Sequence, residues 1–155
     1  MKRLYHAVLI LTVVLFTGGR ALAAGPNAKI MDTAKPIVID GDLSDYTGAP
    51  AIVLDQKSQV VAGKLLWKGP ETASAKIFIT YDKDNIYIGA NINSQNPQFN
   101  TQRDAEIYNG DCLELYFGAD NSDPARVSYA ITDYQIGLSP GKKGDKPQVY
   151  SFTDK

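Results

Sequence analysis

The sequence predicts an all-β protein, an antiparallel β-sandwich of the immunoglobulin-like or jelly-roll-like kind with few or no helices. The 155-residue chain contains many short runs of β-branched and aromatic residues in which apolar and polar side chains alternate. Clusters of Gly, Pro, Asn and Asp separate these runs, and no long stretch places apolar residues at helical spacing. Short strands, frequent turns and the lack of an amphipathic helix are typical of β-sandwiches.

The first 23 residues are predicted to be a cleaved secretory signal. A basic start is followed by an apolar run at residues 7–16 and by the small residues around Ala23. The apolar run is too short to span a membrane. Residues 24–35 then form a polar leader, and residues 36–155 form the folded domain. We therefore expect a secreted or periplasmic protein that does not insert into a membrane once the signal is removed.

The composition after residue 23 excludes several classes of function. Loss of Lys2, Arg3 and Arg20 leaves 13 basic and 17 acidic residues, a formal charge of −4. A mildly acidic surface without a basic run argues against nucleic-acid binding. The single histidine, His6, lies in the signal, which excludes a histidine-based triad, a histidine-ligated haem and most zinc sites. The single cysteine, Cys112, cannot form an internal disulfide and is expected to be packed.

The first predicted strands are short. Residues 37–40 form a β-branched run, residues 52–54 form a second, and residues 60–66 form a third candidate in an irregular region. An acidic turn follows the first run and carries a group of closely spaced aspartates, namely Asp40, Asp42 and Asp45.

These aspartates raise the question of a calcium site. An EF-hand loop needs glycine at its sixth position and glutamate at its twelfth, and counting from Asp40 those positions hold Asp45 and Ala51. The EF-hand interpretation therefore fails. Two interpretations stay open: a looser structural calcium site formed by Asp40, Asp42 and Asp45, or acids that cap the turn.

The clearest predicted element is a β-hairpin. Residues 75–81 and 86–93 alternate apolar and polar side chains around the four-residue acidic turn 82–85. In the first strand Ile77, Ile79 and Tyr81 share a face, and in the second Ile86, Ile88, Ala90 and Ile92 do. Both faces are expected to meet the core.

The strand at residues 113–117 is expected to carry the function. Leu113, Leu115 and Phe117 lie on one side of an extended chain, and Glu114 and Tyr116 lie on the other. Turn residues bound the segment on both sides. The sequence thus predicts a strand that presents a carboxylate and an aromatic ring on its outer face.

The remaining segments complete the prediction. Residues 94–109 are expected to form a polar surface loop, and residues 126–132 a strand with Arg126 on its polar side. Residues 137–146 are expected to form a glycine-rich hairpin loop, and residues 148–152 one further strand.

Three segments in order, residues 38–46, 75–93 and 109–117, resemble the family 9 carbohydrate-binding modules. These are β-sandwich domains that are often attached to xylanases and other polysaccharide-degrading enzymes. The resemblance implies a non-catalytic module that binds a mono- or oligosaccharide, uses structural calcium and assists a glycoside hydrolase in carbohydrate catabolism. It also implies further strands beyond residue 155, so we expect a domain that is incomplete or is completed in another way.

The resemblance also implies roles for individual residues. Tyr108 occupies the position of a sugar-stacking aromatic residue, where the family usually has tryptophan. Glu114 occupies the position of a carboxylate that accepts hydrogen bonds from sugar hydroxyls, and Arg126 that of a basic residue on the following strand. Asp111, the acid that opens the third segment, completes this ligand-binding set. An aromatic ring with fixed charged groups suits a sugar, which offers C–H patches flanked by hydroxyls.

Three alternatives compete with this hypothesis. A periplasmic or surface interaction domain could keep the sandwich fold without binding sugar. A haem or electron-transfer domain of the related DOMON-like type needs axial ligands for the haem iron. The only methionine after the signal is Met31, which lies in the leader, so no haem is expected. A bound nucleotide is not expected either. A glycosidase needs two opposed acids, but Asp111 and Glu114 are three residues apart on one strand and point to opposite faces, so an enzyme is not expected.

Overall fold

The computed structural model describes residues 28–33, 35–118, 122–123, 125–126 and 128–152. The predicted signal, residues 1–23, lies outside them. The described residues form two compact units: Val60–Leu66 together with the chain from Pro97 onward, and the chain up to Gln59 together with Trp67–Asn96. Each unit holds one mainly antiparallel sheet, and the only helices in the described part are short 3-10 turns. The all-β prediction is confirmed, whereas the packing of the two sheets as a sandwich stays a prediction.

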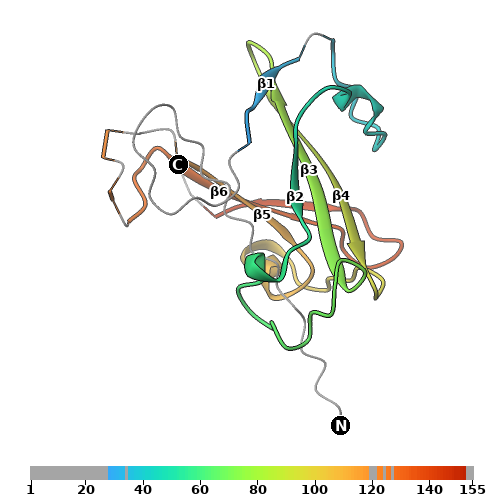
Figure 1. Cartoon of the computed structure of the whole chain (residues 1–155). Coiled ribbons are helices and arrows are strands. Elements are labelled where there is room, and N and C mark those ends of the chain that lie inside the picture. The colour runs from blue at the N-terminus through green and yellow to red at the C-terminus, as the bar shows by residue number, and fades with distance from the viewer. Residues whose placement is uncertain (1–27, 34, 119–121, 124, 127, 153–155) are drawn as a thin grey trace. The chain divides into compact units, whose positions relative to one another are not determined.

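The first sheet, sheet A, is built on the predicted hairpin (Figure 1). Strand β3 (Ala73–Tyr81) pairs antiparallel with β4 (Ile86–Ser94) over its whole length. Strand β2 (Ala51–Leu54) pairs with the first half of β3, and the two-residue β1 (Met31–Asp32) runs parallel to its end. The β-branched alternation of β3 and β4 explains this sheet directly.

Both faces of sheet A are covered at its centre. Ile77 and Ile79 are almost fully buried on one face, as predicted, whereas Tyr81, Ile86 and Ile92, which were also expected to meet the core, are exposed. On the opposite face the ring of Tyr46, from the 3-10 turn η1 (Ser44–Tyr46), lies 5.9 Å from the ring of Phe78. A Cβ on Gly89 would lie 2.7 Å from the Tyr46 ring, so only glycine permits this approach. The turn that contains Asp40, Asp42 and Asp45 therefore places the Tyr46 side chain against the sheet.

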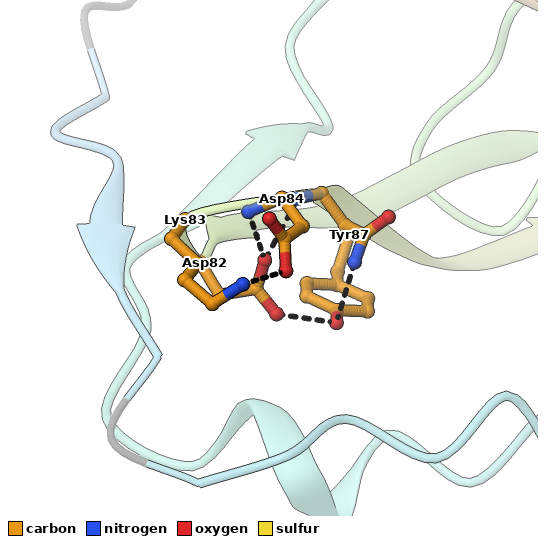
Figure 2. A network of polar contacts seen from close by, with 5 residues as sticks. Asp82, Lys83, Asp84 and Tyr87 are labelled. Carbon is orange, nitrogen blue, oxygen red and sulfur yellow. Dashed lines mark hydrogen bonds and ion pairs between the residues drawn. The ribbon is translucent and has the colours of Figure 1, made fainter.

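The turn of the hairpin is held by one carboxylate (Figure 2). One oxygen of Asp82 accepts hydrogen bonds from the backbone N–H groups of Asp84 and Asn85, at 2.8 and 2.7 Å, and the other accepts one from the Tyr87 hydroxyl at 2.7 Å. Lys83 pairs with Asp84. The bond from Tyr87 is the main cause that holds the pKa of Asp82 below its ordinary value. These acids organise the turn, as their place in it led us to expect.

The second sheet, sheet B, has three antiparallel strands in the order β5 (Leu113–Gly118), β6 (Asp133–Ser139) and β7 (Gln148–Ser151). The predicted central strand is thus confirmed as β5, and the predicted last strand as β7. The loop before β5 contains the 3-10 helix η3 (Asp104–Asn109), which the sequence did not reveal and which packs on β6 and β7. The Ile107 carbonyl of η3 accepts a hydrogen bond from the Asn100 side chain at 2.7 Å.

Three predicted strands are wrong, each because local hydrogen bonds replace a strand partner. In residues 37–40 the Val38 N–H donates to the Asp45 carboxylate at 2.9 Å. Residues 60–66 instead contain a turn in which the Leu66 N–H donates to the Gly63 carbonyl. The described part of residues 126–132 is a loop, and the strand begins only at Asp133, which binds that loop through its side chain. Side chains that offer such bonds compete with a sheet ladder.

No helix among the described residues is long and apolar enough to cross a membrane.

Candidate functional site

The candidate site lies on the face of sheet B that carries Glu114. Tyr116 follows two residues later on β5, and the register places Gln135 of β6 directly opposite Tyr116. Residues opposite each other in an antiparallel pair share a face, so these three side chains meet. The Tyr116 hydroxyl lies 3.3 Å from a Glu114 oxygen, and the Gln135 amide nitrogen lies 3.4 Å from the other oxygen and 3.1 Å from the hydroxyl. We call Glu114, Tyr116 and Gln135 the polar triad.

The carboxylate of the triad is buried, which corrects the prediction that it stands on an exposed outer face. Glu114 is only 5% exposed. Its cross-strand neighbour is Gly137, and a Cβ there would lie 2.7 Å from the Ile107 side chain and 3.0 Å from the Phe152 ring. The two apolar side chains therefore lie over the sheet beside Glu114. A buried carboxylate needs hydrogen-bond donors, and Tyr116 and Gln135 supply them.

Burial also weakens the acidity of the Tyr116 phenol. Loss of solvent, and secondly the charge of Glu114, raise the pKa of Tyr116 to about 12 from 10.0. The phenol therefore keeps its proton further into alkali than an ordinary tyrosine does, and its O–H can donate a hydrogen bond to the carboxylate.

The free thiol of Cys112 lies on the same side of the strand. It is half-buried, and burial raises its pKa to about 11 from 9.0, with the charge of Glu114 as the next cause. A thiol in this environment is protonated and a poor nucleophile.

Tyr108 belongs to an aromatic cluster beside the triad. It lies in η3, is 44% exposed, and its ring is tilted against the Phe152 ring at a centroid distance of 6.4 Å. Phe152 in turn meets Tyr150 edge-on at 5.0 Å. Because Phe152 also lies over Gly137, which pairs with Glu114, Phe152 links the predicted stacking residue to the face of sheet B that carries Glu114.

A buried asparagine holds η3 in place. The Asn100 amide nitrogen donates to the carbonyls of Ile107 and Asp111, at 2.7 and 3.1 Å, and its oxygen accepts from the Gln102 N–H at 2.8 Å. A Cβ on Gly110 would lie 2.3 Å from the Asn100 oxygen, so the segment closes tightly around this side chain. Nothing in the local pattern of a polar loop identifies such a residue, and it was not predicted from the sequence.

Asp111 does not join the polar triad. Its carboxylate accepts a hydrogen bond from the Phe99 N–H at 2.6 Å, which ties the start of β5 to the preceding loop. The side chain thus has a backbone partner of its own, and the structure does not bring it to Glu114.

Arg126 pairs with Asp133 and not with Glu114. Its guanidinium donates to both Asp133 oxygens, one of them at 2.6 Å, and to the Ser128 carbonyl at 2.9 Å. The same carboxylate accepts the Ala130 N–H at 2.9 Å. The side chain lies near Gly118, at the far end of the β5 face that carries the triad. Arg126 therefore braces the loop before β6.

That loop presents an aromatic residue that was not among the predicted site residues. The ring of Tyr129 stacks on the ring of Tyr116, with centroids 6.3 Å apart and planes inclined by 18°. Tyr129 is 64% exposed. Its place next to Tyr116 could not be read from the sequence, because the expected strand over residues 126–132 assigned it to an apolar face. Gln135 was missed for the same reason, since the true strand begins later.

The three aspartates proposed for calcium each cap the backbone of their own turn. Asp40 accepts the Asp42 N–H at 2.8 Å, Asp42 accepts the N–H and hydroxyl of Ser44 at 3.0 Å, and Asp45 accepts the Val38 N–H at 2.9 Å. In the part of the chain that the structure describes, no group of three acidic, histidine or cysteine side chains is arranged to hold a metal ion. The calcium site stays a prediction.

No family model, no curated protein and no solved structure matches this chain. Its function is therefore inferred from the residues and their geometry.

Proposed function

We propose that this protein is a secreted, non-catalytic carbohydrate-binding module whose site is the triad face of sheet B. The observation that carries the proposal is the juxtaposition of a hydrogen-bonded Glu114–Tyr116–Gln135 triad with exposed tyrosine rings on the same face. Tyr108 lies on the η3 side of the triad and Tyr129 on the loop side.

This combination suits the chemistry of a sugar ring. A pyranose has C–H patches that stack on an aromatic face, and hydroxyls around its edge that need fixed donors and acceptors. Gln135 and Tyr116 are less buried than Glu114 and supply an amide and a hydroxyl. Glu114 lies beneath them and orients both groups through its two oxygens. A ligand would thus be held by groups whose positions are set before it arrives.

The arrangement of acids supports binding without turnover. A glycosidase needs a pair of carboxyl groups that flank the scissile bond and have separated pKa values. The Asp111 carboxylate accepts a hydrogen bond from the Phe99 backbone, and the Glu114 carboxylate is bonded to Tyr116 and Gln135. Neither faces the other across an open site.

The proposal also includes export, a partner enzyme and structural calcium. Export through the signal at residues 1–23 would deliver the module to the periplasm or the medium, where a glycoside hydrolase is its expected partner. Structural calcium, if bound through Asp40, Asp42 and Asp45, would stabilise the turn that carries Tyr46. Each of these is part of the proposal.

Titration calorimetry of the purified protein tests the proposal. Xylose, glucose, xylobiose and cellobiose are titrated with and without calcium into the wild type and into Tyr108→Ala and Gln135→Ala. We expect saturable binding that Tyr108→Ala weakens about tenfold, because it removes an apolar ring contact, and that Gln135→Ala weakens further. Tyr81→Ala is the matched control, since Tyr81 is a similarly exposed tyrosine on sheet A.

Absence of heat with all four sugars, from a protein that unfolds cooperatively, would reject the carbohydrate proposal and favour an interaction domain. Equal weakening by Tyr81→Ala would place the site elsewhere. Release of reducing ends from a longer xylan or glucan would contradict the non-catalytic assignment.

A further inference from the structure

Tyr129 is an exposed ring that is nevertheless held in a defined orientation. One of its faces packs on Tyr116 in a nearly parallel stack, with 6.3 Å between centroids, while 64% of the residue remains open to solvent. An exposed tyrosine that only covers apolar surface needs no such orientation. The stack leaves the outer face of the ring available for another flat, apolar surface.

The loop on either side of Tyr129 is tied to one buried carboxylate. The Ser128 carbonyl accepts a hydrogen bond from Arg126, the Ala130 N–H donates to Asp133, and Arg126 and Asp133 are themselves paired. Asp133 is almost fully buried. The backbone on both sides of the ring is thus anchored to the start of β6. The conformational entropy that a ligand would otherwise have to remove has been lost in folding.

Tyr116 connects this ring to the polar triad. Its hydroxyl contacts Glu114 and Gln135, and its ring stacks on the ring of Tyr129. The polar triad and the exposed Tyr129 ring therefore lie next to each other on sheet B. A sugar held at Gln135 and the Tyr116 hydroxyl would place an adjoining sugar unit toward Tyr129.

We propose that Tyr129 is the stacking surface of a second sugar subsite, so that the protein prefers a linked disaccharide or longer chain to the corresponding monosaccharide. This inference rests on the proposed function, because the first subsite is the triad. It adds a residue, Tyr129, and a length preference that the triad alone does not imply. The Arg126–Asp133 pair acts as the brace that positions Tyr129.

The test compares xylobiose with xylose, and cellobiose with glucose, by calorimetry on the purified protein. Tyr129→Ala is expected to weaken disaccharide binding about tenfold, because it removes the ring contact, and to leave monosaccharide binding within about twofold. Tyr129→Phe should retain both affinities, because the ring and not the hydroxyl makes the contact. Tyr134→Ala is the matched control, since Tyr134 is an exposed tyrosine of β6 that alternates to the opposite face.

Tyr129→Trp keeps the test decisive even if the alanine variant folds poorly. Tryptophan should strengthen disaccharide binding, and the emission of the Tyr129→Trp variant should shift with xylobiose but not with xylose. Trp67, whose ring N–H is bonded to the Ala73 carbonyl, provides the constant background. Two results together would overturn the second subsite while the triad site stands. In the first, Tyr129→Ala weakens the binding of both sugars equally or of neither. In the second, xylobiose leaves the emission of the Tyr129→Trp variant unchanged. Absence of any sugar binding by the wild type would instead reject the proposed function itself.

Discussion

The two sheets each contain a carboxylate that is bonded to a tyrosine hydroxyl, and the two pairs differ in what else the carboxylate does. On sheet A, Asp82 lies five residues before Tyr87 and also accepts two backbone N–H groups of its own turn. On sheet B, Glu114 is buried and, among the described residues, is bonded only to the side chains of Tyr116 and Gln135.

The difference separates a structural carboxylate from a candidate functional one. The bonds of Asp82 are all made within the turn and its flanking strand, and its role is complete once the turn has formed. Glu114 caps no backbone group in the described part of the chain, yet burying a charged group is costly. What it does is orient an amide and a phenol that lie close to exposed rings. This is why we place the binding site on sheet B and not at the hairpin turn 82–85 of sheet A, although that turn contains more acidic residues.

The largest effect on stability is expected when the ion pairs of the two units are broken in turn. Arg126→Ala leaves the buried Asp133 carboxylate without its cation and should cost about 2–3 kcal/mol, somewhat less than a fully buried pair because Arg126 is partly exposed. Lys83→Ala removes the exposed pair with Asp84 and should change the free energy of unfolding little. Urea denaturation of both variants measures this. An equal loss of unfolding free energy in both variants would contradict the role of the Arg126–Asp133 pair as the brace of the loop that carries Tyr129.

A smaller effect on stability, but a larger one on binding, is expected from neutralising the two tyrosine-bonded carboxylates. Glu114→Gln keeps the shape but weakens charge-assisted bonds to Tyr116 and Gln135, which should cost about 1–2 kcal/mol and sharply reduce sugar affinity. Asp82→Asn is the matched change on sheet A and should leave affinity unchanged. Calorimetry and urea denaturation of both variants give the comparison. A loss of affinity in Asp82→Asn that equals the loss in Glu114→Gln would remove the distinction between the two carboxylates.

The smallest expected effect is a loss of stability that begins only in alkali. Burial raises the pKa of Tyr116 to about 12 and that of Cys112 to about 11, from ordinary values of 10.0 and 9.0. The folded protein therefore holds these protons more tightly than the unfolded chain does. Their contribution to stability is fully present below pH ~9 and is lost as the pH rises toward ~12.

Urea denaturation from pH 8 to 11 should show this alkaline loss of stability. Tyr116→Phe combined with Cys112→Ala should flatten it, because neither variant side chain titrates. Tyr87→Phe is the control on sheet A, where the hydrogen bond to Asp82 raises the pKa of a half-buried phenol, and it should flatten the curve less. An unchanged alkaline slope in the double variant would show that the triad face is not shielded from water.

The sequence predicted those strands that a local pattern of alternating residues marks out. Hairpin β3–β4 and strand β5 were predicted from period-two alternation between turn residues, and both form. Residues 37–40, 60–66 and 126–132 have similar β-branched or aromatic runs but form no strand in their described parts, because side chains and turns nearby take up their backbone groups. Composition alone does not reveal this competition. It depends on whether a particular carboxylate, such as that of Asp45 or Asp133, lies within reach.

For the site, the sequence was enough to place Glu114 and Tyr116 on one face, because alternation in a strand is a local property of the backbone. The folded structure was needed to show that Glu114 is buried, that Gln135 lies opposite Tyr116 and that Tyr129 stacks on it. It was also needed to show that Arg126 pairs with Asp133 and that Asp111 holds Phe99. Each of these depends on the register of β5 with β6 or on loop closure over many residues. Such contacts arise from packing between distant segments, which no local pattern encodes.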